Sequence, residues 1–123
     1  MKFLLDTDTC IYAIKQNESV LKALLSKSRA DVAVSAVTIW EICIKREIGK
    51  LDFAGSPTTA CREAGFRLLD VTATHAELAG GLPRHHGDSF DRMLIAQAKL
   101  EGFVLATEDR QFSLYGVPIL GTG

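Results

Sequence analysis

Short apolar runs alternate along the chain with longer stretches in which apolar side chains recur at helical spacing. The apolar runs predict strands over residues 2–6, 32–35, 66–71 and 103–107, with an edge strand at 118–120. The intervening stretches predict helices over residues 8–15, 19–26, 37–48, 57–65, 74–81 and 88–100. Strands that alternate with helices predict a mainly parallel sheet of four to five strands with helices on both faces, which is an α/β fold.

Residues at the ends of these segments favour the same boundaries. Gly49 suits the position just after a helix, and Pro57 suits the first turn of the next one. Thr74-His75-Ala76-Glu77 has the pattern of a capping box and predicts a helix start. We expect Thr7 or Asp8 to be the N-cap of the first helix.

Length and charge narrow the class of protein. The chain has 123 residues, of which 47% are hydrophobic, so we expect residues 1–123 to form a single domain with its own core. The absence of a membrane-spanning run and of a signal-peptide pattern predicts a cytoplasmic protein with no membrane role. A net charge of -1 argues against a generic electrostatic nucleic-acid binder. It leaves open an enzyme whose positive charge is a bound metal.

The cysteines do not indicate a disulfide framework or a zinc site. Cys10, Cys43 and Cys61 are odd in number and form no C-x-x-C pair. Each lies in a predicted helix, so we expect buried free thiols.

Four acids fall at boundaries that share one edge of the predicted sheet. Asp6 ends the first strand, and Asp109 follows the fourth. Glu41 and Asp91 lie in the first turns of the predicted helices that start at the same edge. Because ligands of open parallel sheets bind outside the carboxyl ends of the strands, the four carboxylates are candidates for one site.

Clustered carboxylates repel one another unless protons or cations compensate their charge. Ligand sets made only of oxygen favour hard cations, here Mg²⁺ or Mn²⁺. Such ions lower the pKa of water, polarise a phosphate and neutralise charge on a leaving oxygen. The chemistry expected of this edge is therefore hydrolysis of a phosphodiester by metal-activated water.

Helix capping is the simpler explanation for three of these acids. Thr38 with Glu41 has capping-box spacing, Asp88 with Asp91 pairs an N-cap with an acid at N3, and Asp109 can open a short helix. Asp6 is harder to explain in this way, because it follows an apolar strand directly.

Two basic residues near the acids also have two interpretations each. Lys45, one turn after Glu41, either orients that acid or contacts phosphate, or forms an ordinary helical ion pair. Arg92 is either a phosphate contact or part of a surface salt bridge.

Several stretches resemble the PIN-domain ribonucleases, specifically the VapC-type toxins. The start, Leu4-Leu5-Asp6-Thr7, resembles the opening L-L-D-T of that family. Residues 35–45 (SAVTIWEICIK), followed by Gly49-Lys50-Leu51, resemble its S-x-x-[ST]-x-W-E-I-x-I-K…G-K-L segment. Residues 82–98 (LPRHHGDSFDRMLIAQA) resemble L-P-x-x-H-x-D-P-F-D-R-x-L-I-A-Q-A, and Thr107-Glu108-Asp109 resembles the closing T-x-D. The likeness covers nearly the whole chain in order.

The resemblance implies a three-layer α/β/α PIN fold and a Mg²⁺- or Mn²⁺-dependent ribonuclease. It implies a homodimer, an RNA substrate and a small antitoxin protein that blocks the site. The metal ligands and catalytic residues that it implies are the same four acids, Asp6, Glu41, Asp91 and Asp109. The residues that we expect to support them are Thr7, Thr107, Lys45 and Arg92.

The chain departs from the family pattern in two places. Ser89 stands where the family usually has proline, which removes no ligand. Asp8 follows Asp6-Thr7, either as an added charge in the site or, as we favour, as a helix cap.

Two other functions remain open at this point. Asp6 and Asp8 resemble the D-x-D nucleophile motif of haloacid-dehalogenase-like phosphatases. An inactive PIN-like scaffold that binds RNA or protein is the other alternative. Basic residues around the acids would position RNA without specifying its sequence, and the candidates are Lys45, Arg46, Lys50, Arg84, His85, His86 and Arg92.

Overall fold

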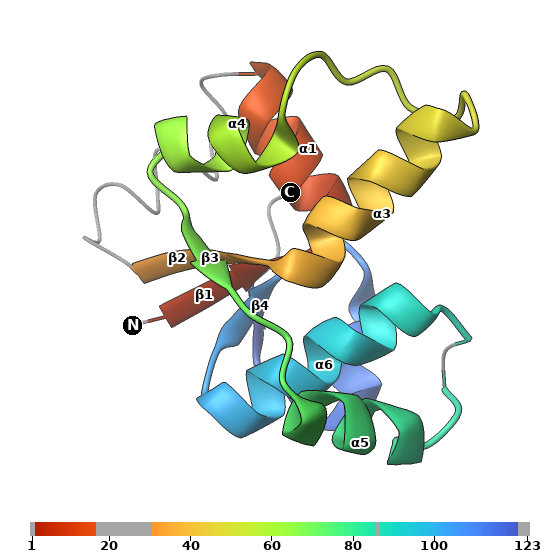
Figure 1. The fold of residues 1–123 in the computed structure, drawn as a ribbon. Coiled ribbons are helices and arrows are strands. Elements are labelled where there is room, and N and C mark those ends of the chain that lie inside the picture. Colours follow the sequence, from red (N-terminus) through yellow and green to blue (C-terminus); the bar gives the residue numbers. More distant parts are fainter. Residues whose placement is uncertain (1, 17–30, 86, 121–123) are drawn as a thin grey trace.

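A computed structural model describes residues 2–16, 31–85 and 87–120 (Figure 1). The helix expected over residues 19–26, and His86 of the basic candidates, lie outside the described residues.

The centre of the fold is a five-stranded sheet in which every pairing is parallel, in the order β3-β2-β1-β4-β5. The apolar first run therefore forms the central strand, and Phe3, Leu4 and Leu5 are all buried. The predicted edge strand near residue 119 is confirmed, since it pairs with β4 alone. The strands are β1 (Lys2–Leu5), β2 (Asp31–Ser35), β3 (Arg67–Leu69), β4 (Val104–Ala106) and β5 (Ile119–Leu120).

Helices cover both faces of the sheet, which confirms the predicted three-layer α/β fold (Figure 1). Helices α1 and α4 lie over one face, and α5 and α6 lie under the other. Helix α3 follows β2 and extends past the carboxyl end of the sheet, where it contacts α1, α4 and α6. The described helices are α1 (Thr7–Gln16), α3 (Ala36–Glu47), α4 (Pro57–Glu63), α5 (Ala73–Gly81), α6 (Ser89–Glu101) and the 3₁₀ helix η1 (Arg110–Tyr115).

The alternation of side chains along β1 divides the core into two layers. Leu4 points to the face under α6 and packs in a cluster with Leu94 and Leu105. Phe3 and Leu5 point to the opposite face and pack in the cluster that contains Cys10 and Cys61. From Phe3 to Leu5 this strand is apolar and buried, and the first acid, Asp6, follows it at the carboxyl end of the sheet.

The glycine at the end of α3 behaves as its sequence predicts. Helix α3 ends at Glu47 with Ile48 as its C-cap, and Gly49 follows with φ 77°. This left-handed conformation is favoured only for glycine.

The start of α5 differs from its prediction. Its N-cap is Thr72, whose hydroxyl accepts from the backbone N–H of His75, and the His75 ring accepts in return from the N–H of Thr72. The capping box predicted at Thr74 and Glu77 is therefore wrong by two residues. The strand before it is also shorter than predicted, since β3 ends at Leu69 and Asp70 is exposed.

The three cysteines are free thiols, as predicted, but the predicted burial is correct only for Cys10 and Cys61. Cys10 and Cys61 are buried between α1 and α4, with their sulfurs 3.8 Å apart, and Cys43 is partly exposed. Among the described residues, no helix is long and apolar enough to cross a membrane.

The burial of β4 gives a test of this arrangement. Leu105 is fully buried between the sheet and α6, so Leu105→Ala should lower the free energy of unfolding by about 2–5 kcal/mol. Leu100→Ala removes the same atoms from a position in α6 that is 44% exposed, and it should cost less than about 1 kcal/mol. Urea denaturation monitored by circular dichroism measures both values, and equal losses would contradict the packing described here.

Candidate functional site

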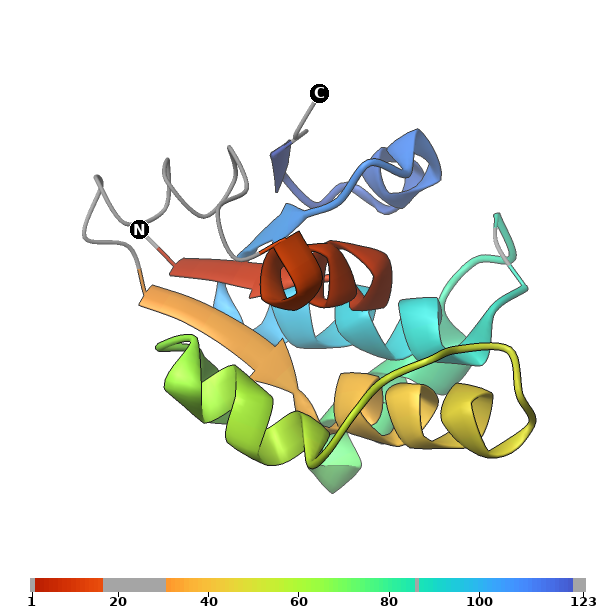
Figure 2. The same cartoon turned by 90° about the horizontal axis from the view of Figure 1, so that it is seen from above.

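The candidate site lies where the carboxyl ends of β1, β2 and β4 meet the starts of α1 and α3. Figures 1 and 2 show β1 and β2 pointing toward the side of the molecule on which α3 and the first turn of α6 lie. The sheet order places β2 on one side of β1 and β4 on the other. Chain connections leave in opposite directions at such a point, which is where open α/β sheets bind ligands.

Asp6 is buried at the end of β1 and is also the N-cap of α1. Its Oδ1 accepts from the backbone N–H of Thr9 at 2.8 Å, and its Oδ2 accepts from the hydroxyl of Thr107 at 2.6 Å. The prediction that Thr7 or Asp8 caps this helix is therefore wrong. Thr7 is the first helical residue, and Asp8 is an exposed acid in the first turn.

The environment of Asp6 resists its negative charge. Burial raises the pKa of the Asp6 carboxyl and outweighs the hydrogen bonds from Thr107 and Thr9, which lower it. The nearby charge of Asp8 raises the pKa further. A cation placed against this carboxylate would relieve the cost of its burial.

Glu41 is the second buried carboxylate, and both of its oxygens have a partner. The Thr7 hydroxyl donates to Oε1 at 2.5 Å, and the Lys45 ammonium lies 2.7 Å from Oε2. The Thr7 hydroxyl also lies 3.3 Å from that of Thr38. Thr38 is fully buried near the carboxylate, whereas its sequence spacing to Glu41 predicts only a helix cap.

Glu41 is not a capping residue. The N-cap of α3 is Ser35, whose hydroxyl accepts from the N–H of Val37 at 3.1 Å. The capping box considered for Thr38 and Glu41 is therefore wrong, because both residues lie inside the helix and are buried. The burial of Glu41 thus has no local backbone explanation.

Asp91 lies in the first turn of α6 and is partly buried. The predicted cap is confirmed here, since Asp88 is the N-cap and its Oδ1 accepts from the Asp91 N–H at 3.1 Å. The helix start therefore uses the Asp91 backbone N–H and the Asp88 side chain, so Asp91 itself is not the cap.

Asp109 is the N-cap of η1, as its position predicts, and its Oδ1 accepts from the Gln111 N–H at 2.9 Å. Its own N–H donates to the Thr107 hydroxyl at 3.0 Å. Because Thr107 also donates to Asp6, one buried hydroxyl joins the ends of β1 and β4.

Two pairs of groups are brought together by these contacts. Asp6 is joined to Asp109 through Thr107, and Glu41 is joined to α1 through Thr7, the residue after Asp6. Within residues 2–16, 31–85 and 87–120, no group of three His, Cys, Asp or Glu side chains is placed to hold a metal ion. The donors are nevertheless all oxygen atoms, two of the acids are buried, and the pKa of Asp6 is raised. This chemistry fits a hard divalent cation.

Arg92 makes backbone contacts that its sequence position does not predict. Its guanidinium donates to the carbonyls of Ala79, Leu82 and Pro83 at 2.9–3.0 Å. These carbonyls lie in the last turn of α5 and just after it. Arg92 therefore fastens the end of α5 to the first turn of α6, in which Asp91 lies.

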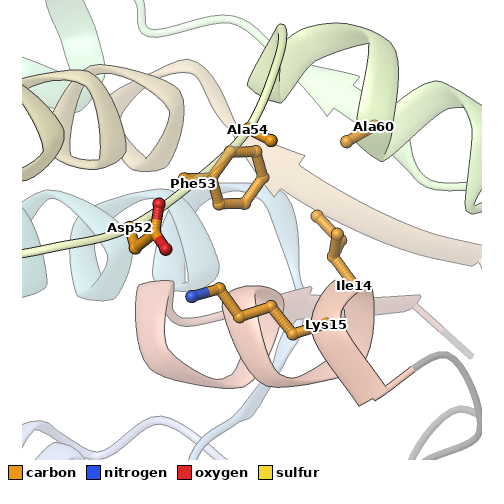
Figure 3. Close-up of a pocket in the computed structure, with 6 residues that line it drawn as sticks. All are labelled: Ile14, Lys15, Asp52, Phe53, Ala54 and Ala60. Carbon is orange, nitrogen blue, oxygen red and sulfur yellow. The ribbon is translucent and has the colours of Figure 1, made fainter.

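A pocket of about 350 Å³ lies elsewhere on the molecule, between α1, α4 and the loop that precedes α4 (Figure 3). Lys15 points its amine toward Asp52 at its rim. The pocket contains none of the four candidate acids, and it is lined by Ile14, Lys15, Asp52, Phe53, Ala54 and Ala60.

The raised pKa of Asp6 predicts a gain in stability when its charge is removed. The folded chain holds this proton more tightly than the unfolded chain, so the contribution of Asp6 to stability falls as the pH rises past its ordinary value of 3.8 and stays low at pH 7. Asp6→Asn should therefore raise the free energy of unfolding at pH 7 without divalent cations, and the gain should disappear below pH 3.8.

Asp8→Asn is the matched control for this measurement, since Asp8 is exposed two residues away and its replacement should change stability by less than about 0.5 kcal/mol. Urea titrations at several pH values measure both variants. A loss of stability for Asp6→Asn at pH 7 would show that its hydrogen bonds outweigh the cost of burying its charge.

Known proteins share both the sequence pattern and the fold. A curated relative from Shigella flexneri, the tRNA(fMet)-specific endonuclease VapC, is 27% identical over 126 residues, which cover 94% of this chain and 93% of the relative. A crystal structure of VapBC2 from Rickettsia felis superposes with a TM-score of 0.79 at 16% identity, over the full length of both chains. A DNA-bound VapBC from Salmonella typhimurium gives a TM-score of 0.74 at 21% identity and covers 100% of this chain and 99% of that one. The PIN-domain family model matches residues 3–117, and the chain therefore belongs to the PIN-domain family, as its motifs predict.

Proposed function

We propose that this chain is a divalent-metal-dependent endoribonuclease and the toxin of a VapC-type toxin–antitoxin pair, acting in the cytoplasm. The observation that carries the proposal is the pair of buried carboxylates, Asp6 and Glu41, at the carboxyl end of the sheet of a PIN domain. The likeness to a VapC endonuclease over 94% of the chain supports nuclease chemistry. The family match over residues 3–117 supports our proposal that residues 1–123 form a single PIN domain.

The proposed catalytic and metal-binding residues are Asp6, Glu41, Asp91 and Asp109. A bound Mg²⁺ or Mn²⁺ would supply activation of water, polarisation of the phosphate and neutralisation of the leaving oxygen. The chain itself supplies orientation. Asp6 is fixed by Thr9 and Thr107, so its carboxylate cannot rotate freely before a ligand arrives.

The supporting residues hold the proposed metal ligands in place and do not themselves serve as ligands. Thr107 holds Asp6 and the backbone of Asp109, and Thr7 holds Glu41. Arg92 fixes the helix start that carries Asp91, through three carbonyl groups of the preceding segment. Hydrogen bonds of this kind orient metal ligands, and those donated to a carboxylate favour its ionised form.

The partners that we propose are an RNA substrate, a small antitoxin protein and a second copy of the chain. The Shigella flexneri relative is named for its action on a tRNA, and the Rickettsia felis and Salmonella typhimurium structures are of VapBC assemblies. An antitoxin that masks the carboxylates would account for the control of a nuclease in which two proposed ligands, Asp6 and Glu41, are already buried and oriented.

Membership of the PIN family removes the main support for the phosphatase alternative. That class needs Asp8 as an acid and base next to the Asp6 nucleophile, but Asp8 is an exposed residue of α1. The alternative of an inactive scaffold has the same fold, and only activity measurements separate it from an enzyme.

Cleavage of RNA tests the proposal directly. Purified protein free of antitoxin should cut RNA with Mn²⁺ or Mg²⁺, and excess chelator should stop the reaction. Asp6→Asn and Asp91→Asn should each lower the rate by more than the roughly 10–100-fold that the loss of an outer-shell residue causes. Gel analysis of a labelled RNA pool measures these rates.

Asp8→Asn is again the matched control, because it makes the same change to an exposed acid of α1 and should leave the rate within a few-fold of the original. Cleavage that persists in the Asp6 and Asp91 variants would contradict the assigned site. A wild-type protein that binds RNA and cuts none of the pool would favour the scaffold.

A further inference from the structure

We infer that Lys45 is a resident counter-cation of Glu41, and that a divalent metal must displace its ammonium group before Glu41 can act as a ligand. This inference rests on the proposed function, because it concerns the same carboxylate. It assigns Lys45 a role in setting metal affinity, which an ordinary surface ion pair does not have.

A metal can bind Glu41 only if it displaces one of the two groups that contact the carboxylate oxygens. The Thr7 hydroxyl occupies Oε1 at 2.5 Å, and Thr7 is itself buried. The Lys45 ammonium occupies Oε2 at 2.7 Å. Both oxygens of the carboxylate are therefore engaged by the chain's own groups.

Exposure distinguishes the two partners of Glu41. The side chain of Lys45 is 39% exposed, whereas that of Glu41 is 6% exposed. A cation that approaches from solvent therefore meets Lys45 before it meets Oε2, and the long lysine side chain is free to swing away. The partner that can yield is the lysine and not the buried threonine.

The charges around Lys45 show that it lies among acids from several elements. Its pKa is raised, first by the hydrogen bond to Glu41 and then by the charges of Glu41, Asp8 and Asp88. These acids come from α3, from α1 and from the N-cap of α6. The ammonium thus compensates negative charge where three helices converge, which is the compensation that a metal ion would otherwise provide.

Competition between the two cations has a measurable consequence. If a metal and the lysine exclude each other at Oε2, the loss of the lysine must tighten metal binding, because the two equilibria are linked reciprocally. Coupling between sites is typically at least about fivefold in affinity. An exposed helical ion pair with no such role would leave metal affinity unchanged.

The experiment is a calorimetric titration of the whole chain with Mn²⁺ alone, without RNA. Lys45→Met keeps an unbranched side chain of similar length and removes the charge, and it should bind Mn²⁺ at least about fivefold more tightly than the wild type. Lys45→Arg keeps the charge and should bind no more tightly than the wild type. The rise in melting temperature at a fixed Mn²⁺ concentration should follow the same order.

Two controls isolate the contact with Glu41. Lys50→Met removes the same charge from an exposed position just after α3, and it should leave Mn²⁺ affinity within about twofold of the wild type. In a Glu41→Gln background, Lys45→Met should lose its effect, because the oxygen for which the cations compete is then uncharged. Far-UV circular dichroism checks that each variant is folded.

The outcomes separate this inference from the function on which it rests. Mn²⁺ binding by the wild type with equal affinity in Lys45→Met would overturn the counter-cation role and leave the proposed metal site intact. Weaker binding in Lys45→Met would also overturn it, since the lysine would then assist the metal. A wild type that binds no Mn²⁺ in calorimetry or in melting experiments would overturn both.

Discussion

The burial of two carboxylates at one sheet edge is the constraint on which the rest of the site depends. An ionised carboxylate is costly to remove from water unless hydrogen bonds or charges compensate it. The central position of β1 makes the compensation possible from both sides. Asp6 reaches Thr107 beyond β4, and Thr7 reaches Glu41 in the helix after β2. Two consecutive residues thus join segments that lie 101 and 34 residues away in the sequence.

The sequence was sufficient to predict the layers of the fold, because the strands are short apolar runs and the helices end at recognisable residues such as Gly49. It was weaker wherever a side chain took an unusual capping role. His75 accepts the N-cap hydrogen bond that the capping-box pattern assigns to Glu or Gln, so the pattern predicts an N-cap at Thr74 instead of Thr72. This histidine is buried against α6, where its ring contacts Gln97 and Glu101. A sequence pattern around residue 75 carries no information on these distant partners.

The same limit applies to the acids. A capping pattern and a ligand pattern use the same residue types, and only the fold separates them. At Asp88 and Asp109 the capping interpretation is correct, whereas for Glu41 it fails because Ser35 already caps the helix. Asp6 caps α1 with one oxygen and accepts from Thr107 with the other, so its capping role is compatible with the ligand role that we propose for it. The surrounding hydroxyls were harder to predict, because a threonine contributes to a site only through partners that are distant in the sequence.

The two basic residues beside the acids show how side-chain chemistry divides their roles. Arg92 presents a planar fork of donors and uses it on three carbonyls at once, which makes a fixed joint between α5 and α6. Lys45 makes one contact through a single ammonium group at the end of a flexible chain. Breaking three directed hydrogen bonds together is costly, whereas one partly exposed ion pair is worth little against a competing divalent charge. A lysine at position 45 therefore suits an ammonium group that a metal has to displace from Glu41. An arginine at position 92 suits a guanidinium group whose contacts between α5 and α6 have to persist.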